Sequence, residues 1–259
     1  DAVSTDGSLY IVSQSSPIFK ISQINSSTTT LVNVMLGGSI ITGSPAGSMI
    51  KPHLDRFLVS GSSRIADENT VYFSSINSLN TWPAANFFEI FAQSGERITC
   101  IGDPIFGNVP LYTDRSVRII TGSEYPDEEL PGNINVRTVY EGIGCASHRS
   151  VKNMKNRQYF FSFGENKLVP GIYEFNGVSV KEKTKSIRRF MTDRVQNSTA
   201  TLARAFIDND KYCVAVATKG WPFTDTIICV DEGNRVVRFH SPFQIVGADV
   251  DNGEIWLLA

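Results

Sequence analysis

Short apolar runs, rich in β-branched and aromatic residues, recur along this chain and are separated by Gly, Asn, Asp and Pro. Such runs are typical of β-strands joined by turns, and no helix-length window keeps apolar residues at the three-and-four spacing of an amphipathic helix. The most regular series comprises residues 9–12, 57–60, 110–113, 159–162, 213–216 and 255–258. Its spacing of roughly 43 to 54 residues is the period expected of a repeated supersecondary unit.

Each member of this series has companions that together make a four-stranded unit. A second apolar run follows across turn residues, at 17–21, 71–74, 117–120, 172–175 and 227–230. A third run follows Asn176-Gly177 or Gly233-Asn234, pairs that accept the positive φ of a tight hairpin. A run rich in small residues precedes each unit and would suit a crowded innermost strand, at 40–43, 98–102, 143–147, 202–205 and 245–248.

The repeat predicts an all-β fold, namely a β-propeller of four-stranded antiparallel blades. We expect a single domain over residues 1–259, whole or as part of a longer chain. Dividing the length by the period gives about five blades, with six as the alternative. Pairing of N-terminal with C-terminal strands in one blade would close the ring and remove exposed sheet edges. The alternative fold, one or two β-sandwiches, is disfavoured by the repeat period.

The charge balance bears on the class of partner. Lys and Arg number 24 and Asp and Glu 26, a formal net charge of -2, whereas nucleic-acid-binding proteins usually carry a basic excess. DNA contact is therefore not supported by the net charge, although a basic stretch runs from Lys181 to Arg189. We interpret that stretch as a solvated loop or outer strand in preference to a phosphate-binding surface. No apolar run approaches the ~18 residues needed to cross a bilayer, so we expect no membrane partner.

The four cysteines, Cys100, Cys145, Cys213 and Cys229, form no CxxC pair of the kind found in zinc sites. Each lies among apolar or small residues, where a free cysteine behaves as a small hydrophobe, so we favour four reduced, buried thiols. Cys213 and Cys229 fall on strands that we expect to be neighbours, which makes theirs the one disulfide to test.

Residue types that carry out catalysis are present, but the patterns that catalysis requires are not. His53 and Asp55 would share one face of a strand, but no nucleophile motif accompanies them, so we interpret them as bracketing a turn. The stretches 208–210 and 249–251, each with two Asp residues, resemble turns more than glycosidase or calcium sites. We therefore expect no enzymatic activity, no metal site and no cofactor.

Aromatic residues in the expected loops are the candidates for contact with a partner. Trp82 and Trp221 each precede a proline, and a Trp there either anchors a partner or fills the gap between blades. Phe87 and Phe88 follow Trp82 in the same segment. Tyr125 lies in the turn-rich segment 123–132, which we expect to protrude between two strands of one unit.

One segment, residues 55–122, resembles propeller-type structural proteins of tailed bacteriophages. The features that carry the resemblance are the strand Val71-Tyr72-Phe73-Ser74, Trp82 followed by Asn86-Phe87, the entry Gly95-Glu96-Arg97-Ile98-Thr99, and the strand pair Leu111-Tyr112-Thr113-Asp114-Arg115-Ser116-Val117. The match covers about a quarter of the chain and includes no catalytic residue.

The resemblance implies a tail-hub, nozzle or packaged-DNA-stabilising component of the neck or tail. Such a protein would be found in the virion after assembly in the host cytoplasm. It would act through contacts with other virion proteins and with copies of itself. The alternative function is a secreted carbohydrate-binding or carbohydrate-active propeller, which would need aromatic platforms and paired carboxylates at one end of the channel.

Overall fold

A computed structural model describes most of the chain. The described residues are 2–5, 8–13, 16–21, 38–40, 44–61, 68–78, 80–90, 95–126, 132–163, 170–245, 247–251 and 254–258. The chain divides into two compact units: the first comprises residues 1–101 and 121–136, and the second comprises residues 102–120 and 137–259. No described helix is long and apolar enough to cross a bilayer.

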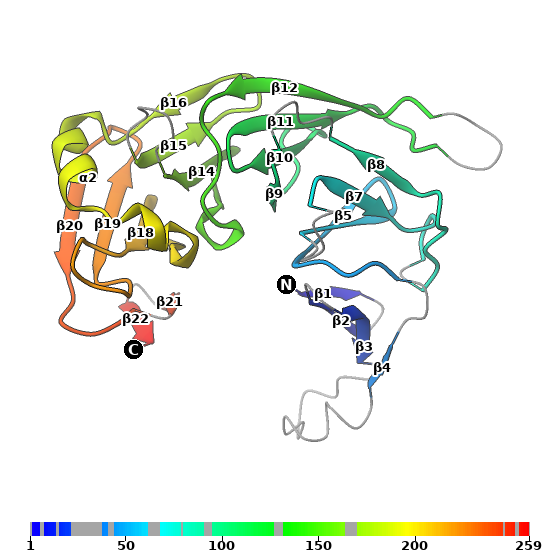
Figure 1. Ribbon diagram of the computed structural model, residues 1–259, viewed down its shortest axis with the longest axis horizontal. Coiled ribbons are helices and arrows are strands. Elements are labelled where there is room, and N and C mark those ends of the chain that lie inside the picture. The colour runs from blue at the N-terminus through cyan, green and yellow to red at the C-terminus, as the bar shows by residue number, and fades with distance from the viewer. Residues whose placement is uncertain are drawn as a thin grey trace. The chain divides into compact units, whose positions relative to one another are not determined.

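The described strands form antiparallel sheets in which strands follow one another in chain order (Figure 1). One sheet contains β1 (Ala2–Thr5), β2 (Ser8–Ser13), β3 (Ser16–Ile21) and β4 (Gly38–Ile40). The next contains β5 (Met49–His53), β6 (Arg56–Ser60), β7 (Thr70–Phe73) and β8 (Phe87–Glu89). A third contains β9 (Ile98–Ile101), β10 (Val109–Thr113), β11 (Ser116–Thr121) and β12 (Asn135–Glu141).

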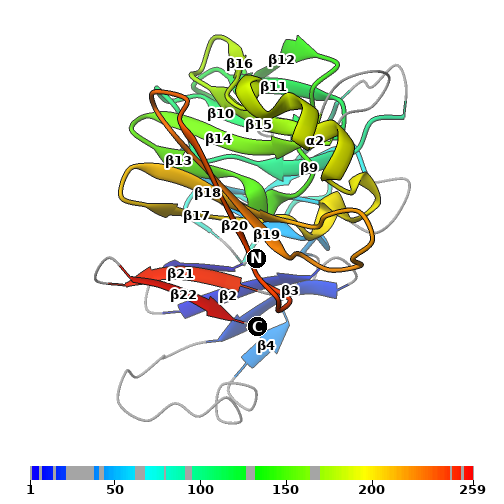
Figure 2. The same cartoon turned by 90° about the vertical axis from the view of Figure 1, so that its left-hand side faces the viewer.

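Two further four-stranded sheets belong to the second unit (Figure 2). The first of them contains β13 (Lys152–Met154), β14 (Arg157–Ser162), β15 (Gly171–Phe175) and β16 (Val180–Glu182). The second contains β17 (Arg204–Asp208), β18 (Lys211–Val216), β19 (Thr226–Asp231) and β20 (Val236–His240). A two-stranded sheet follows, with β21 (Gly247–Asp251) and β22 (Glu254–Leu258). The predicted repeat of four-stranded antiparallel sheets is therefore confirmed.

In the sheets from β5 to β20, burial changes regularly from the second to the fourth strand. All residues of β10 and β15 are buried, and so are all residues of β14 and β18 after the first. Fourth strands such as β12 and β20 are largely exposed. Strands covered on both faces read as continuous apolar runs without alternation, which is why the series beginning at 57–60 stands out in the sequence.

Successive sheets within each unit stack with their first strands side by side. In the first unit β1 lies beside β5, and β5 lies beside β9. In the second unit β13 lies beside β17, and β17 lies beside β21. First strands that neighbour one another in this way are the arrangement found around the axis of a propeller.

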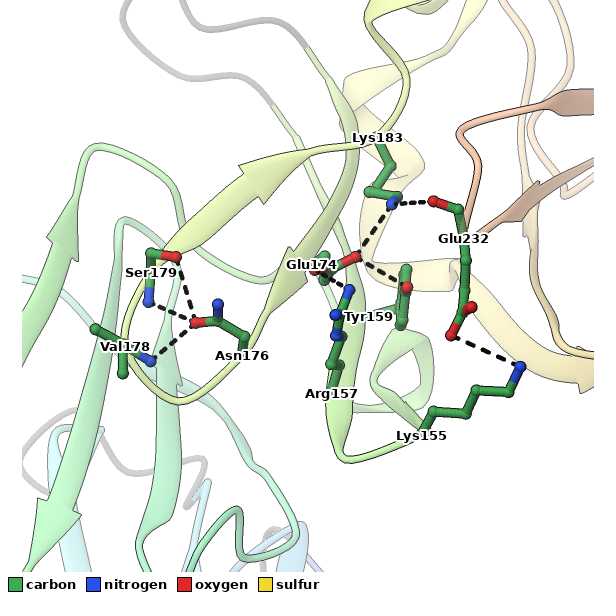
Figure 3. A network of polar contacts seen from close by, with 9 residues as sticks. All are labelled: Lys155, Arg157, Tyr159, Glu174, Asn176, Val178, Ser179, Lys183 and Glu232. Atoms are coloured by element: carbon green, nitrogen blue, oxygen red, sulfur yellow. Dashed lines mark hydrogen bonds and ion pairs between the residues drawn. The ribbon is translucent and has the colours of Figure 1, made fainter.

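The connections between the first and second strands of several sheets contain two-residue turns in which both residues have positive φ. The pairs are Leu54-Asp55, Phe106-Gly107, Lys155-Asn156 and Asn209-Asp210. Such turns match the right-handed twist of the flanking strands and favour Gly, Asn or Asp. The outer hairpin at Asn176-Gly177 was predicted and is confirmed: the Asn176 side chain accepts hydrogen bonds from the backbone N–H groups of Val178 and Ser179 (Figure 3).

Some first strands were placed wrongly from the sequence. Residues 143–147 are not a strand, because β13 begins later, at Lys152, after a 3-10 turn η2 (His148–Ser150). Of the predicted first strand 40–43, Ile40 ends the fourth strand β4 and residues 41–43 lie outside the described part of the chain, while the first strand of the next sheet is β5. Small residues occur where the chain passes close to its neighbours, and this happens in connections as well as in innermost strands. In the connection before β13, for example, a Cβ on Gly144 would lie 2.1 Å from the Asp114 carbonyl carbon.

The second unit contains a helical connection and a disulfide. Between β16 and β17 lie η3 (Lys185–Ile187), α2 (Arg188–Arg194) and η4 (Asn197–Leu202), and Met191 of α2 packs in the core with Tyr159 and Tyr212. Cys213 and Cys229 are directly opposed on β18 and β19 and form a disulfide. The favoured expectation of four reduced thiols was therefore wrong for this pair, whereas Cys100 and Cys145 are free and buried as expected.

Candidate interaction surface

A buried ion pair at the centre of a polar network lies between the sheets β13–β16 and β17–β20 of the second unit (Figure 3). The Lys183 ammonium lies 3.1 Å from a carboxylate oxygen of Glu174, and the two side chains are 2% and 6% exposed. Tyr159 donates a hydrogen bond to the same carboxylate at 2.9 Å, and Arg157 donates to its other oxygen at 2.9 Å. The carboxylate therefore has three donors, which is what a buried charge requires.

The network continues to the neighbouring sheet through the turn between β19 and β20. Lys183 donates to the backbone carbonyl of Glu232 at 3.1 Å. Lys155, in the turn before β14, lies 2.8 Å from Asp210 and 3.7 Å from the Glu232 carboxylate (Figure 3 shows the latter contact). These contacts join two successive sheets, so the network fixes how the sheets pack.

The protonation states of this network suit a structural role. Burial alone would raise the pKa of the Glu174 carboxyl. Hydrogen bonds from Lys183 and Tyr159 and the charges of Lys183 and Arg157 outweigh that effect and lower the pKa below its usual value. Burial and the hydrogen bond to Glu174 raise the pKa of Tyr159. Both groups therefore hold one charge state at neutral pH, which favours a permanent ion pair over proton transfer.

A second polar cluster lies in the first unit, around His53 at the end of β5. His53 Nδ1 lies 2.7 Å from the hydroxyl of Tyr125, and both side chains are buried. The Arg56 guanidinium lies over the rings of Tyr125 and Phe73, at 5.7 and 5.5 Å from their centroids. Burial raises the pKa of Tyr125, and the charge of Arg56 opposes that rise. The partner of His53 is thus Tyr125, and Asp55 forms the turn that the sequence indicated.

The candidate anchors of the first unit differ in exposure. Tyr125 is 5% exposed, so its contacts are internal and tie the start of segment 123–132 to the sheet β5–β8. Residues 127–131 of that segment lie outside the described part of the chain. Trp82 is half-buried. Phe88 is half-buried and stacks on Phe73, whereas Phe87 is 43% exposed and contacts Tyr72.

Trp221 and the outer strand β20 expose apolar side chains in the second unit. Trp221 is 47% exposed and packs against Phe223, with ring centroids 5.3 Å apart. Val237, Phe239 and Phe243 are 45%, 52% and 66% exposed. The last three had no separate signal in the sequence, because an exposed outer strand and a buried one share the same β-branched and aromatic composition.

We call Val237, Phe239 and Phe243 the apolar edge. Val237 pairs with Cys229 and Phe239 pairs with Ile227, so both lie on the sheet face that carries the core cluster of Cys213, Ile227 and Cys229. Phe243 follows in the connection to β21. On the opposite face Arg238 lies over the Phe190 ring of α2, 4.2 Å from its centroid. On one face of β20, Arg238 therefore contacts α2, while the apolar side chains of the other face are exposed.

Comparison with known proteins identifies the fold. No protein-family model and no curated protein sequence matches this chain. Among solved structures, the AfRom2 CNH domain is 9% identical with a TM-score of 0.55, over 100% of this chain and 77% of that one. Streptogramin B lyase is 13% identical with a TM-score of 0.53, over 98% and 73%. An acylaminoacyl peptidase of Pyrococcus horikoshii is 14% identical with a TM-score of 0.50, over 95% and 39%.

These likenesses, at such low identity, concern the fold alone. Together with the sheet topology they show that the chain has a β-propeller-like fold. The activities that the names describe belong to those proteins, because function depends on the residues of a site and not on the fold that carries it.

Proposed function

We propose that this protein is a non-enzymatic structural component of a tailed-virus particle, in the neck or tail. It would act through contacts with other virion proteins and with copies of itself. Two observations support the proposal: the resemblance of residues 55–122 to propeller-type phage proteins, and the exposed apolar edge of the second unit. Exposed large apolar side chains that gather on one surface commonly mark protein contacts.

The position of the apolar edge carries the argument for a subunit contact. The hairpin β21–β22 follows β20, and β21 lies beside β17, the first strand of the same sheet. In the described part of the chain, β20 is the fourth strand of its own sheet, whereas β21 and β22 form a separate two-stranded sheet. We infer that strands of a neighbouring polypeptide cover Val237 and Phe239, since burial of that apolar surface is favourable.

We further propose six blades in place of five. Six hairpins of first and second strands support this count: β1–β2, β5–β6, β9–β10, β13–β14, β17–β18 and β21–β22. Closure of the ring by pairing of N-terminal with C-terminal strands stays a prediction, because β1–β4 belong to the first unit and β21–β22 to the second.

The contact proposal is tested by assembly state. The purified chain should form oligomers in size-exclusion chromatography with light scattering, and Phe239→Ser with Phe243→Ser should release monomers because the buried contact is lost. A matched control is Phe106→Ser with Val178→Ser, which removes two side chains of 76% and 75% exposure elsewhere in the same unit and should leave the oligomer intact.

A monomer of the unaltered chain would contradict the proposed subunit contact. The location is tested by antibody labelling of purified particles under the electron microscope, which should mark the neck or tail. Particles that lack the chain would contradict the virion assignment.

The second candidate function is carbohydrate binding. The pair of exposed Trp221 and half-buried Phe223 favours it, because adjacent aromatic rings form platforms for sugar rings. A monomer that binds a glycan array, and loses that binding in Trp221→Ala, would support this candidate in place of the virion proposal.

A further inference from the structure

The sheets β13–β16 and β17–β20 have two chemically different ends. Successive connections of an antiparallel meander alternate between the ends of a sheet. The short turns 155–156, 176–179, 209–210 and 232–235 lie at one end, the turn end. The connections 142–151, 163–170, 183–203, 217–225 and 241–245 lie at the other, the loop end, and residues 164–169 are outside the described part of the chain. Contacts agree with this division: Lys155 pairs with Asp210 at the turn end, and Lys219 donates to the Thr192 carbonyl at the loop end.

The loop end of the second unit is basic, although the whole chain has a net charge of -2. Asp193 is the exposed carboxylate in the described parts of the loop-end connections, and Asp225 is 1% exposed and bonded to Thr218. Exposed cations in the same connections are more numerous: Arg149, Lys185, Arg188, Arg189, Arg194 and Lys219. Two of them are ion-paired, Arg188 with Glu182 at the end of β16 and Arg189 with Asp193, so the excess of positive charge remains with the others. Charge is therefore segregated within the unit, and the net charge of the chain hides the local excess.

Two arginines lie close together at the inner part of this end. Turn η2, which contains Arg149, packs beside β17, which begins at Arg204. Partial burial and the positive charge of Arg149 both lower the pKa of Arg204. Among the described residues, neither guanidinium is paired with a carboxylate. Arg149 is exposed and Arg204 is partly buried. Two like charges close together are unfavourable alone and become favourable when an anion lies between them.

We propose that the loop end of the second unit binds a single-stranded nucleic acid. Arg149 and Arg204 would contact its phosphates at the inner side, and the arginines of α2 would contact them at the outer side. Phosphate suits guanidinium groups because it accepts paired hydrogen bonds from them. Trp221, exposed in the same connection as Lys219, is positioned to stack on an unpaired base. A basic surface with an exposed aromatic ring is the combination that binds single strands without sequence preference.

This inference does not depend on the virion proposal, since either can fail alone. Its test is fluorescence anisotropy of a labelled single-stranded DNA of about 30 nucleotides with the full, nuclease-treated chain, over a series of NaCl concentrations. Affinity should fall steeply with salt, because each phosphate contact releases counterions. Arg149→Gln with Arg189→Gln should weaken binding on the order of tenfold and reduce the salt slope by about 1.4. Trp221→Ala should weaken the single strand about tenfold and a duplex of the same sequence far less.

The matched control removes the same charge from the turn end. Lys155→Gln with Arg235→Gln should leave the affinity and the salt slope unchanged, and circular dichroism should show the same fold for all variants. Equal weakening by changes at both ends would overturn the proposal, because it would indicate a non-specific charge effect. Absence of binding at low salt, or equal affinity for poly-glutamate of matched length, would also overturn it, the latter in favour of an acidic polypeptide as the partner.

Discussion

At the scale of single residues, one buried ion pair joins two elements of the second unit. Glu174 is a lone acid in a buried strand, Lys183 follows the strand β16, and the two meet as a 2% and 6% exposed ion pair. The sequence marks Glu174 as unusual, because a charge within an apolar strand needs a partner. The sequence does not show that Lys183, among the 24 Lys and Arg residues, is the partner of Glu174, because the partner is determined by the register of β15 against β16.

The Glu174–Lys183 pair yields a prediction about stability. Glu174→Gln should lower the free energy of unfolding by about 3 kcal/mol, because it leaves the Lys183 charge buried and uncompensated. The double variant Glu174→Gln with Lys183→Met should recover part of this loss. Urea unfolding monitored by fluorescence measures both values. Asp193→Asn, which breaks the exposed i,i+4 pair with Arg189, is the control and should change the stability little.

The same pair sets a dependence on pH. The folded pKa of Glu174 lies below its unfolded value, which is about 4.3. Its contribution to stability is therefore complete above that pH and is lost as the pH falls through the folded pKa. Glu174→Gln should remove this part of the acid sensitivity, and an unchanged acid transition would show that the pair does not stabilise the fold.

At the scale of elements, the strands follow from local composition and their turns from a few special residues. The strands near 57–60, 110–113, 159–162 and 213–216 were predicted correctly because burial on both faces makes them continuously apolar. The innermost strands were placed less well. β13 is three residues long and polar at two of them, so its position depends on pairing with β14 and not on its own sequence.

The turn between β5 and β6 contains a residue that is poorly suited to it. Leu54 has φ of 49° and is 41% exposed, so it bears the strain of a left-handed conformation with little compensating burial. Leu54→Asn should raise the free energy of unfolding by about 0.5 to 1 kcal/mol, because Asn tolerates positive φ. Chemical denaturation measures the change. Leu202→Asn is the matched control, since Leu202 is 44% exposed without positive φ, and a gain of the same size there would refute the turn explanation.

At the scale of the whole molecule, the repeat relates the parts of the chain to one another. First strands neighbour one another within each unit, and the hairpin β21–β22 continues the series after the sheet β17–β20. This pattern also accounts for the apolar edge, which lies on the sheet face that a further complete blade would cover. The proposed blade number and the proposed subunit contact therefore both depend on what packs against the sheet β17–β20.

The six-blade proposal predicts what electron microscopy of the assembled protein should show. Averaged views along the axis should contain six radial sheets, with density from a neighbouring polypeptide over Val237 and Phe239. Five radial sheets would contradict the count. Six complete sheets built from one chain would agree with the proposed number of blades but would contradict the proposed contact with a neighbouring polypeptide.

The sequence alone determined the all-β class, the four-stranded repeat and most second and third strands, because these depend on local apolar runs and turn residues. Only the tertiary structure decided which distant residues meet. It paired His53 with Tyr125, joined Cys213 to Cys229, and gathered the arginines of η2, α2 and β17 at one end of the second unit. The physical reason is that the net charge sums all charged residues whatever their position. The antiparallel meander places alternate connections at opposite ends of the sheets, so that positive and negative residues can lie at different ends.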